Sequence, residues 1–290
     1  MGPDGRRLSA AAVMLARRQL SPPALCWQLR VLTVCGSTEQ RLSQWLQTGG
    51  ADDCGVNLAL DPALHPALNP ALSPTLDSRR ARALLAIHQR YGHGQRGRSW
   101  SAPPGGLWLS ASLPWPADAA NAASLSLAVA VGLALELEAL ELNVRIKWPN
   151  DLLVQGRKIA GLLPRLRLRA GRVVGARIGL GLNGSNRVPP GAINLSQALM
   201  ARRSFPRAAA ANVAPMTTAA LAAKGLRALE WAVAAAGDGE AVRRAAEARL
   251  LLGADPLIEN GQAWEPVGLE RDGALRVRRQ GEERLLQRSF

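Results

Sequence analysis

Hydrophobic and polar residues alternate along several stretches of the chain, and this period of two predicts half-buried strands. In residues 24–33, for example, Trp27 and Leu29 alternate with Gln28 and Arg30. Further strands are predicted over residues 84–89, 106–113, 143–147, 158–169 and 172–182. The last two are separated only by Ala170-Gly171, which predicts an antiparallel hairpin with one solvated face.

Other stretches predict helices. Residues 119–142 are almost continuously apolar but are interrupted by polar residues such as Asn121 and Glu136. That pattern predicts a central core helix and no membrane span. Ser37 or Thr38 is suited to cap a helix that runs to about residue 48. Two more helices are predicted over residues 215–236 and 240–252.

Changes of texture along the chain predict its domains. Residues 24–252 mix strands and helices and predict an α+β catalytic domain with a mixed or antiparallel sheet. From Pro256, closely spaced turn pairs such as Asp272-Gly273 predict a small β-barrel over residues 253–290. Residues 62–76 repeat proline at every fourth position, which excludes a helix and predicts a surface insertion. Residues 1–23 lack a convincing secretory signal and are predicted to be a disordered or non-native extension.

The net charge of +14 is carried almost wholly by arginine, and Lys147, Lys158 and Lys224 are the three lysines. The arginines are spread along the chain, which favours a solvated surface over a single basic face. A basic nucleic-acid-binding protein is the alternative from another class. It would need aromatic side chains interleaved with a basic patch, but aromatic residues make up 4% of the chain.

The cysteines indicate the redox environment. Cys26, Cys35 and Cys54 have no metal-binding spacing, and their odd number leaves one thiol unpaired. This usage is typical of a reducing compartment, so we expect a cytoplasmic protein without a preformed metal site.

Four blocks of sequence carry candidate chemistry. The glycine/arginine loop from Gly92 to Trp100 offers backbone amides and positive charge to a phosphate. In the block 147–152, Lys147 lies where a strand ends and could neutralise a carboxylate and a phosphate as they join. The block 158–163 follows after a short spacer. The fourth block, residues 179–183, ends an apolar strand with glycines and Asn183. Each block alone is also typical of an ordinary turn.

Together the blocks resemble the biotin protein ligase (biotin–[acetyl-CoA-carboxylase] ligase) family. The resemblance runs from about Leu32 to the C-terminus and includes Ser37-Thr38, the glycine/arginine loop, the strand 106–110, and the blocks at 147–163 and 179–183. It implies a catalytic sheet that holds biotin and ATP, followed by a small SH3-like β domain. It also implies that biotin is activated with Mg²⁺-ATP to biotinyl-5′-AMP. The biotinyl group then passes to a lysine of the biotin carboxyl carrier protein.

The resemblance also implies roles for individual residues. Lys147 and Arg98 would act in catalysis. Biotin would be bound by Ser37, Thr38, Glu39, Gln89, His93, Gly94, Gln95, Gly106, Leu107, Lys147 and Gly161. ATP and the adenylate would be bound by Gly92, Arg96, Arg98, Trp100, Asn150, Lys158 and Asn183.

Three residues depart from the family's usual pattern: Glu39 follows Ser37-Thr38 in place of asparagine, and His93 and Gln95 replace loop arginines. Gln95 in particular predicts looser retention of the adenylate. Some relatives carry an N-terminal DNA-binding module of about 60 residues, whereas 36 residues precede Ser37 here, so we expect no DNA binding or repressor function. A homodimer is a possible assembly. A lipoate–protein ligase is the nearest alternative enzyme.

Overall fold

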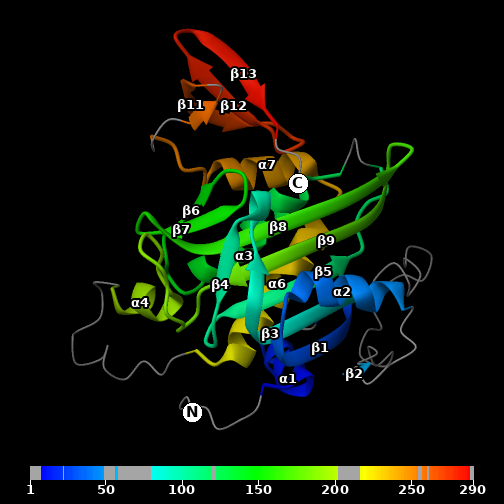
Figure 1. The fold of residues 1–290 in the computed structure, drawn as a ribbon. Helices are drawn as coiled ribbons and strands as arrows, with labels where there is room; N and C mark the ends of the chain where they lie inside the picture. Colours follow the sequence, from blue (N-terminus) through cyan, green and yellow to red (C-terminus); the bar gives the residue numbers. More distant parts are fainter. Residues whose placement is uncertain are drawn as a thin grey trace.

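A nine-stranded mixed sheet forms the body of the protein in the computed structural model (Figure 1). The structure describes residues 8–21, 23–48, 56–57, 80–118, 122–201, 216–253, 257–259 and 261–287. The strands follow the order β2-β1-β3-β5-β9-β8-β7-β6, and β4 pairs with β3. Their bounds are β1 Cys26–Cys35, β2 Val56–Asn57, β3 Arg80–His93, β4 Ser99–Ala102, β5 Leu107–Leu113, β6 Val144–Lys147, β7 Asp151–Val154, β8 Arg157–Arg169 and β9 Arg172–Leu182. Only β1 and β3 run parallel among these pairs, so the predicted α+β class with a mixed sheet is confirmed.

Three helices cover one face of this sheet, because every second residue of the strands is apolar and points toward them. They are α1 (Ala10–Leu20), α3 (Leu125–Glu138) and α6 (Thr218–Ala235); α3 packs on α6, and α6 on α1. α3 is buried on nearly all sides, as its continuous apolar sequence predicts. It is shorter than the predicted helix of residues 119–142.

On the opposite side of the sheet, the helix α2 (Thr38–Gln47) packs on β3 and β5. Its apolar residues Leu42 and Trp45 form a small core with Leu84 of β3. Among the described residues, this second face is therefore covered only in part, and the remaining area beside the N-terminus of α2 is available for a cavity.

The prediction of a disordered N-terminal extension is wrong for residues 8–21, where α1 packs into the core. Val13 and Met14 are buried, and so is Arg17, which pairs with the buried carboxylate of Glu230 on α6. Glu230 also accepts hydrogen bonds from the Trp27 indole (2.7 Å) and the backbone amide of Ala24 (3.1 Å). A buried charge is stable only when it is paired and hydrogen-bonded. The Arg17–Glu230 ion pair therefore holds α1 against α6.

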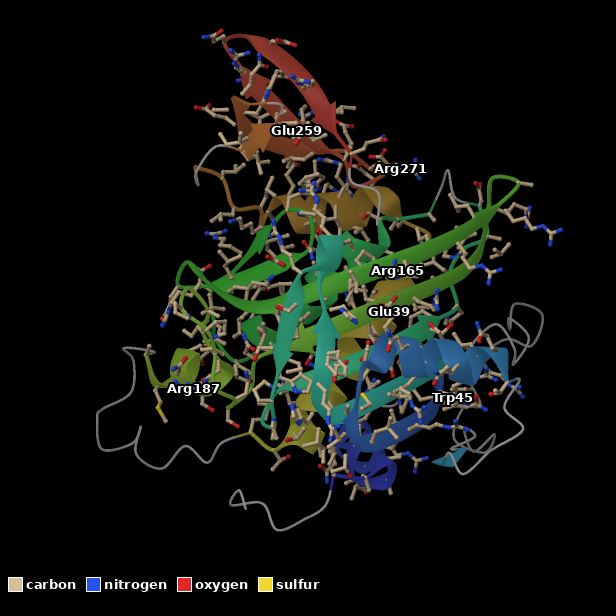
Figure 2. The ribbon with its side chains drawn as sticks, in the orientation of Figure 1. Glu39, Trp45, Arg165, Arg187, Glu259 and Arg271 are labelled. Atoms are coloured by element: carbon tan, nitrogen blue, oxygen red, sulfur yellow. The ribbon has the colours of Figure 1, made fainter. Side chains whose placement is uncertain are left out.

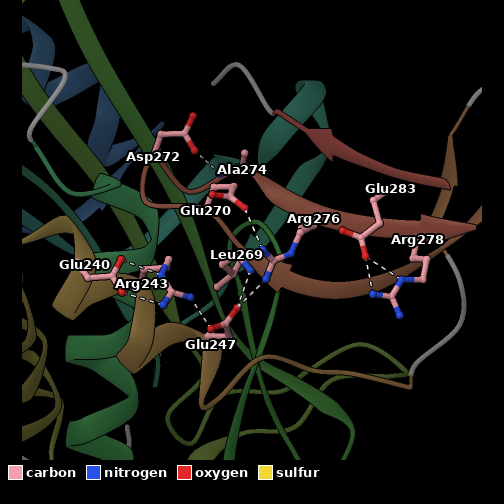
Figure 3. Close-up of polar contacts among 10 residues, drawn as sticks. All are labelled: Glu240, Arg243, Glu247, Leu269, Glu270, Asp272, Ala274, Arg276, Arg278 and Glu283. Carbon is pink, nitrogen blue, oxygen red and sulfur yellow. Dashed lines mark hydrogen bonds and ion pairs between the residues drawn. The ribbon is translucent and has the colours of Figure 1, made fainter. Parts of the chain in front are cut away.

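The C-terminal residues form a second, four-stranded antiparallel sheet: β10 (Leu257–Glu259), β11 (Gln262–Leu269), β12 (Leu275–Arg279) and β13 (Glu282–Leu286). It stacks on α7 (Gly239–Glu247), where Glu247 accepts the Leu269 amide at 2.9 Å (Figure 3). In the described residues the strands pair in sequence order without β13 meeting β10. The predicted closure into a barrel therefore stays a prediction, as does the boundary near Gly253.

Two further expectations concern the proline repeat and the absence of a membrane span. The proline repeat of residues 62–76 lies outside the described residues. Among the helices that the structure describes, none has both the length and the apolar character needed to cross a bilayer.

Candidate functional site

A cavity of about 160 Å³ opens on the partly covered face of the sheet, beside the N-terminus of α2. Its walls come from the start of α2, the β3–β4 loop, and strands β5, β7, β8 and β9. Segments that are distant in sequence therefore meet here.

Glycines form the floor of this cavity. Gly161 of β8 lies opposite Gly181 of β9, and Gly179 lies two residues before Gly181 on the same face. The indole of Trp100 rests on this floor: a Cβ added at Gly181 would lie 2.7 Å from the ring, and one at Gly161 would lie 2.9 Å from it. A side chain at either position would therefore displace the tryptophan or fill the slot.

One end of the cavity is lined by neutral hydrogen-bonding groups. Ser37 and Thr38 are buried, although they begin α2, and the Ser37 side chain makes no capping bond. Thr38 donates its amide (2.7 Å) and its hydroxyl (3.0 Å) to the Gln89 side-chain oxygen, and its hydroxyl is 2.8 Å from that of Ser110. This cluster is suited to a polar, uncharged group of a ligand.

Glu39 lies at the rim beside this neutral end. Its carboxylate pairs with the Arg165 guanidinium from β8, and the two labelled side chains lie together in Figure 2. The ion pair joins α2 to β8 across the edge of the cavity.

The other end of the cavity is charged. Lys158 Nζ lies 2.7 Å from Asp151 Oδ1 and 5.0 Å from the centre of the Trp100 ring. Asn150 is fixed beside them, because its side chain donates to the Leu162 carbonyl (2.6 Å) and its own carbonyl accepts the Leu162 amide (2.9 Å). A lysine held between a carboxylate and an aromatic ring is suited to bind an anion that enters the slot.

The β3–β4 loop forms the wall of the cavity that faces the glycine floor. His93, Gly94, Gln95 and Arg98 line it, and the loop is narrowed by a bond from the Gly94 amide to the Arg98 carbonyl (2.8 Å). Two buried donors of this loop and its following strand, Gln95 Nε2 and Trp100 Nε1, have no hydrogen-bond partner within the described protein. Buried donors are normally paired, so a ligand acceptor is their natural complement.

The cavity brings together twelve of the residues that the sequence indicates: Ser37, Thr38, Glu39, Gln89, His93, Gly94, Gln95, Arg98, Trp100, Asn150, Lys158 and Gly161.

Lys147, expected to be the catalytic lysine, is outside the cavity lining. It is exposed at the end of the edge strand β6, opposite Asp151 of β7. The following bond, Trp148–Pro149, is cis, and the Trp148 indole donates to the Gly273 carbonyl of the C-terminal sheet (2.8 Å). Lys158 takes the interior position instead.

Five more predicted residues lie outside the lining: Gly92, Arg96, Gly106, Leu107 and Asn183. Leu107 points to the helix-covered face, where a Cβ on Gly225 of α6 would come within 2.6 Å of it. Arg96 is exposed, with a left-handed backbone (φ 56°). The Asn183 amide is buried and bonded within its own loop.

The structure also adds residues that the predicted set omitted. Ser110, Gly179, Gly181 and Asp151 line the cavity together with Ser99, Leu109, Leu162, Leu163 and Leu180. Asp151 lies in the block 147–152, and Gly179 and Gly181 lie in the block 179–183. The motifs could therefore have indicated these three residues. Ser110 could have been found from strand alternation, because it lies opposite Gly179.

The described cysteines are not part of this chemistry. Burial raises the pKa of the Cys35 thiol, and the nearby Arg41 opposes this shift only in part. Among the described residues, no three His, Cys, Asp or Glu side chains gather closely enough to hold a metal.

The fold and cavity define a class of protein: an α+β domain whose glycine-floored slot has a neutral polar end and a charged end that contains the Lys158–Asp151 ion pair. Residues 77–183 match the sequence model of the biotin/lipoate A/B protein ligase family, which is about a third of the chain. The matched segment contains most of the cavity lining.

Curated relatives align over a little more than a third of the chain. The bifunctional ligase/repressor BirA of Escherichia coli is 36% identical over 104 residues, which is 35% of this chain and 32% of BirA. A biotin–[acetyl-CoA-carboxylase] ligase of Paracoccus denitrificans is 34% identical over 114 residues, 38% of this chain and 47% of that protein. The alignment with BirA thus spans about a third of that protein's length.

Solved structures share the fold over a longer range. The biotin protein ligase from Aquifex aeolicus, in complex with biotin and ATP, has a TM-score of 0.58 and 20% identity, covering 89% of this chain and 95% of that chain. The biotin protein ligase from Leishmania major in complex with biotinyl-5-AMP has a TM-score of 0.54 and 18% identity, covering 90% and 99%. At these identities the likeness establishes the fold alone.

Proposed function

We propose that the protein is an ATP-dependent biotin protein ligase. The observation that carries the proposal is the polarity of the slot, in which the neutral cluster at Thr38 and the cation of Lys158 stand at opposite ends of a glycine floor. Biotin has the matching polarity: an uncharged ureido ring at one end and a carboxylate at the other.

In this proposal the residues act as follows. The ureido group is bound by Ser37, Thr38 and Gln89, and the Trp100 ring covers the apolar middle of the molecule. Lys158 holds the carboxylate against the α-phosphate of Mg²⁺-ATP, which lowers the cost of bringing two anions together. A carboxylate oxygen attacks the α-phosphorus, pyrophosphate leaves, and biotinyl-5′-AMP remains under the loop of residues 92–98.

In the second step, a lysine amine of the carrier protein attacks the carbonyl carbon of the adenylate and AMP leaves. We propose the biotin carboxyl carrier protein of acetyl-CoA carboxylase as the acceptor. The enzyme name of the Paracoccus relative supports this choice.

Biotin-dependent exchange of labelled pyrophosphate into ATP tests the first step directly. Transfer of labelled biotin to purified carrier protein tests the second. We expect both with Mg²⁺ present and neither without ATP. Absence of exchange from folded protein that is supplied with biotin and Mg²⁺-ATP would overturn the proposal.

Lipoate ligation is the alternative that the shared family leaves in place. Lipoate also carries a carboxylate, but its dithiolane ring has no ureido group to bond with Thr38 and Gln89. The neutral cluster therefore favours biotin. Excess lipoate should leave biotin-dependent exchange unchanged, whereas effective competition by lipoate would favour the alternative.

The remaining expectations are proposals of the same kind: a cytoplasmic protein without repressor function, a possible homodimer, and an SH3-like character of the C-terminal sheet. An operator-DNA shift assay at physiological salt tests the absence of repressor function, because nonspecific binding weakens steeply with salt. Sedimentation with and without biotin tests the assembly.

A further inference from the structure

The strand that carries Lys158 is irregular at this residue. In β8, both Ile159 and Ala160 are fully buried toward the helix-covered core, whereas Gly161 and Lys158 on either side line the cavity. Regular alternation would turn Lys158 to the opposite face from the one it occupies. The register shift between Leu152 and Leu153 of β7 marks a β-bulge here, and a bulge re-aims a side chain in this way.

The backbone of the bulge is held by a loop rather than by a strand. β9 ends at Leu182, opposite Ala160. Because the two strands are antiparallel, Ile159 and Lys158, which precede Ala160 in β8, pair with the segment that follows β9. The Asn183 amide donates to the Ile159 carbonyl (2.9 Å), and the Ile193 amide donates to the Lys158 carbonyl (2.9 Å). The Lys158 amide donates to the Gly191 carbonyl (3.1 Å).

Three buried asparagines hold that loop in shape: Asn183, Asn186 and Asn194. Asn186 accepts the Gly184 amide (3.0 Å) and donates to the side-chain oxygen of Asn183 (3.1 Å). Asn194 donates to the Asn186 carbonyl (2.8 Å). Asn183 donates to the carbonyl of Ile193 (3.3 Å), the residue that pairs with Lys158.

We infer that this asparagine network is a positioning device, which locks the bulge and so aims Lys158 into the cavity. The expected effect on catalysis rests on the proposed function, whereas the expected effect on the position of Lys158 does not. This role replaces the expectation that Asn183 binds the nucleotide, because the side-chain nitrogen and the side-chain oxygen of Asn183 are both hydrogen-bonded inside the loop.

Two variants and one matched control test the network. Asn186→Ala removes its central bonds. Asn194→Asp removes the donor to the Asn186 backbone carbonyl but keeps a side-chain oxygen that can accept the Gln197 amide and cap α4 (Leu195–Met200). The control, Gln197→Ala, removes the other half of that capping box and leaves the tether between Asn194 and Asn186 intact.

The first measurement is independent of activity. Because the chain has only three lysines, amine labelling followed by mass spectrometry gives the modification rate of each. Release of Lys158 from Asp151 should raise its rate relative to Lys147 several-fold in Asn186→Ala and Asn194→Asp, and not in Gln197→Ala. An unchanged ratio in both variants would overturn the inference.

The second measurement links the network to Lys158. A positioning error of about 1 Å costs up to about a hundredfold in rate, so Asn186→Ala should lower kcat for pyrophosphate exchange at least tenfold. The dissociation constant for biotin should change less than kcat does, because the neutral end that binds the ureido group is built elsewhere. In a Lys158→Ala background, Asn186→Ala should have little further effect; additive losses would also overturn the inference. Inactive wild-type protein would instead count against the proposed function, and the labelling result would still decide the inference.

Discussion

Replacement of Lys158 by alanine should reduce adenylate formation by about a hundredfold. The ammonium group lies 2.7 Å from Asp151 Oδ1 at the charged end of the cavity, and its side chain is 35% exposed. Without it, the Asp151 carboxylate would face the two anions that must combine, which adds repulsion to the lost attraction.

The magnitude follows from the geometry. Two unit charges about 4 Å apart attract by about 4 kcal/mol at an effective dielectric constant of about 20. Solvent around a third-exposed side chain screens part of this, which leaves roughly 3 kcal/mol. Since each 1.36 kcal/mol changes a rate about tenfold, the loss is about two orders of magnitude, in line with the removal of one stabilising group from other active sites.

The assay is biotin-dependent exchange of labelled pyrophosphate into ATP, with Lys147→Ala as the matched control. Both variants lose one lysine, but Lys147 is exposed outside the cavity, so its loss should cost less than about tenfold. The reverse order, with the larger loss in Lys147→Ala, would refute the assignment of the catalytic lysine from the cavity. Circular dichroism of each variant shows whether the fold is retained.

Three further substitutions test separate parts of the structure. Gly181→Ala places a methyl group 2.7 Å from the Trp100 ring, so biotin affinity measured by calorimetry should fall at least tenfold; unchanged affinity would exclude this floor from the site. Gln95→Arg adds a cation to the loop over the cavity, and less free biotinyl-AMP should appear in a single-turnover supernatant than with the wild type. Equal release would show that Gln95 does not set retention. Glu230→Ala leaves the buried Arg17 unpaired, so urea unfolding should show a loss of about 3–5 kcal/mol; a loss below about 1 kcal/mol would contradict the role given to this ion pair.

Much of the fold is predictable from sequence because alternation reports burial directly. The strand predicted over residues 172–182 has the bounds of β9, and the hairpin turn falls at Ala170 and Gly171, both with positive φ. The N-terminal helix escaped prediction for a physical reason. Arg17 is a surface residue by its local pattern, and its buried partner Glu230 lies 213 positions away.

The candidate site was predictable in its parts but not in its assembly. The sequence blocks contain most of the cavity lining, because side chains that meet a ligand cluster at strand ends and turns. Whether a given lysine in such a block points into the cavity depends on the register of its strand, because one extra residue turns the side chain to the other face of the sheet. For this reason the sequence alone could not tell that Lys158, and not Lys147, lines the cavity.

The bulge at Lys158 connects these observations. The core demands burial of two consecutive residues, Ile159 and Ala160, and a regular strand cannot bury both on one face. The strand therefore carries an irregularity, and the bonds that it cannot make with a neighbouring strand are made by the loop that contains Asn183 and Ile193. Asparagine, with a donor and an acceptor in one short side chain, can satisfy such a loop without water. The same irregularity turns the lysine toward the cavity, so the requirement to fill the core and the position of the cation have one structural cause.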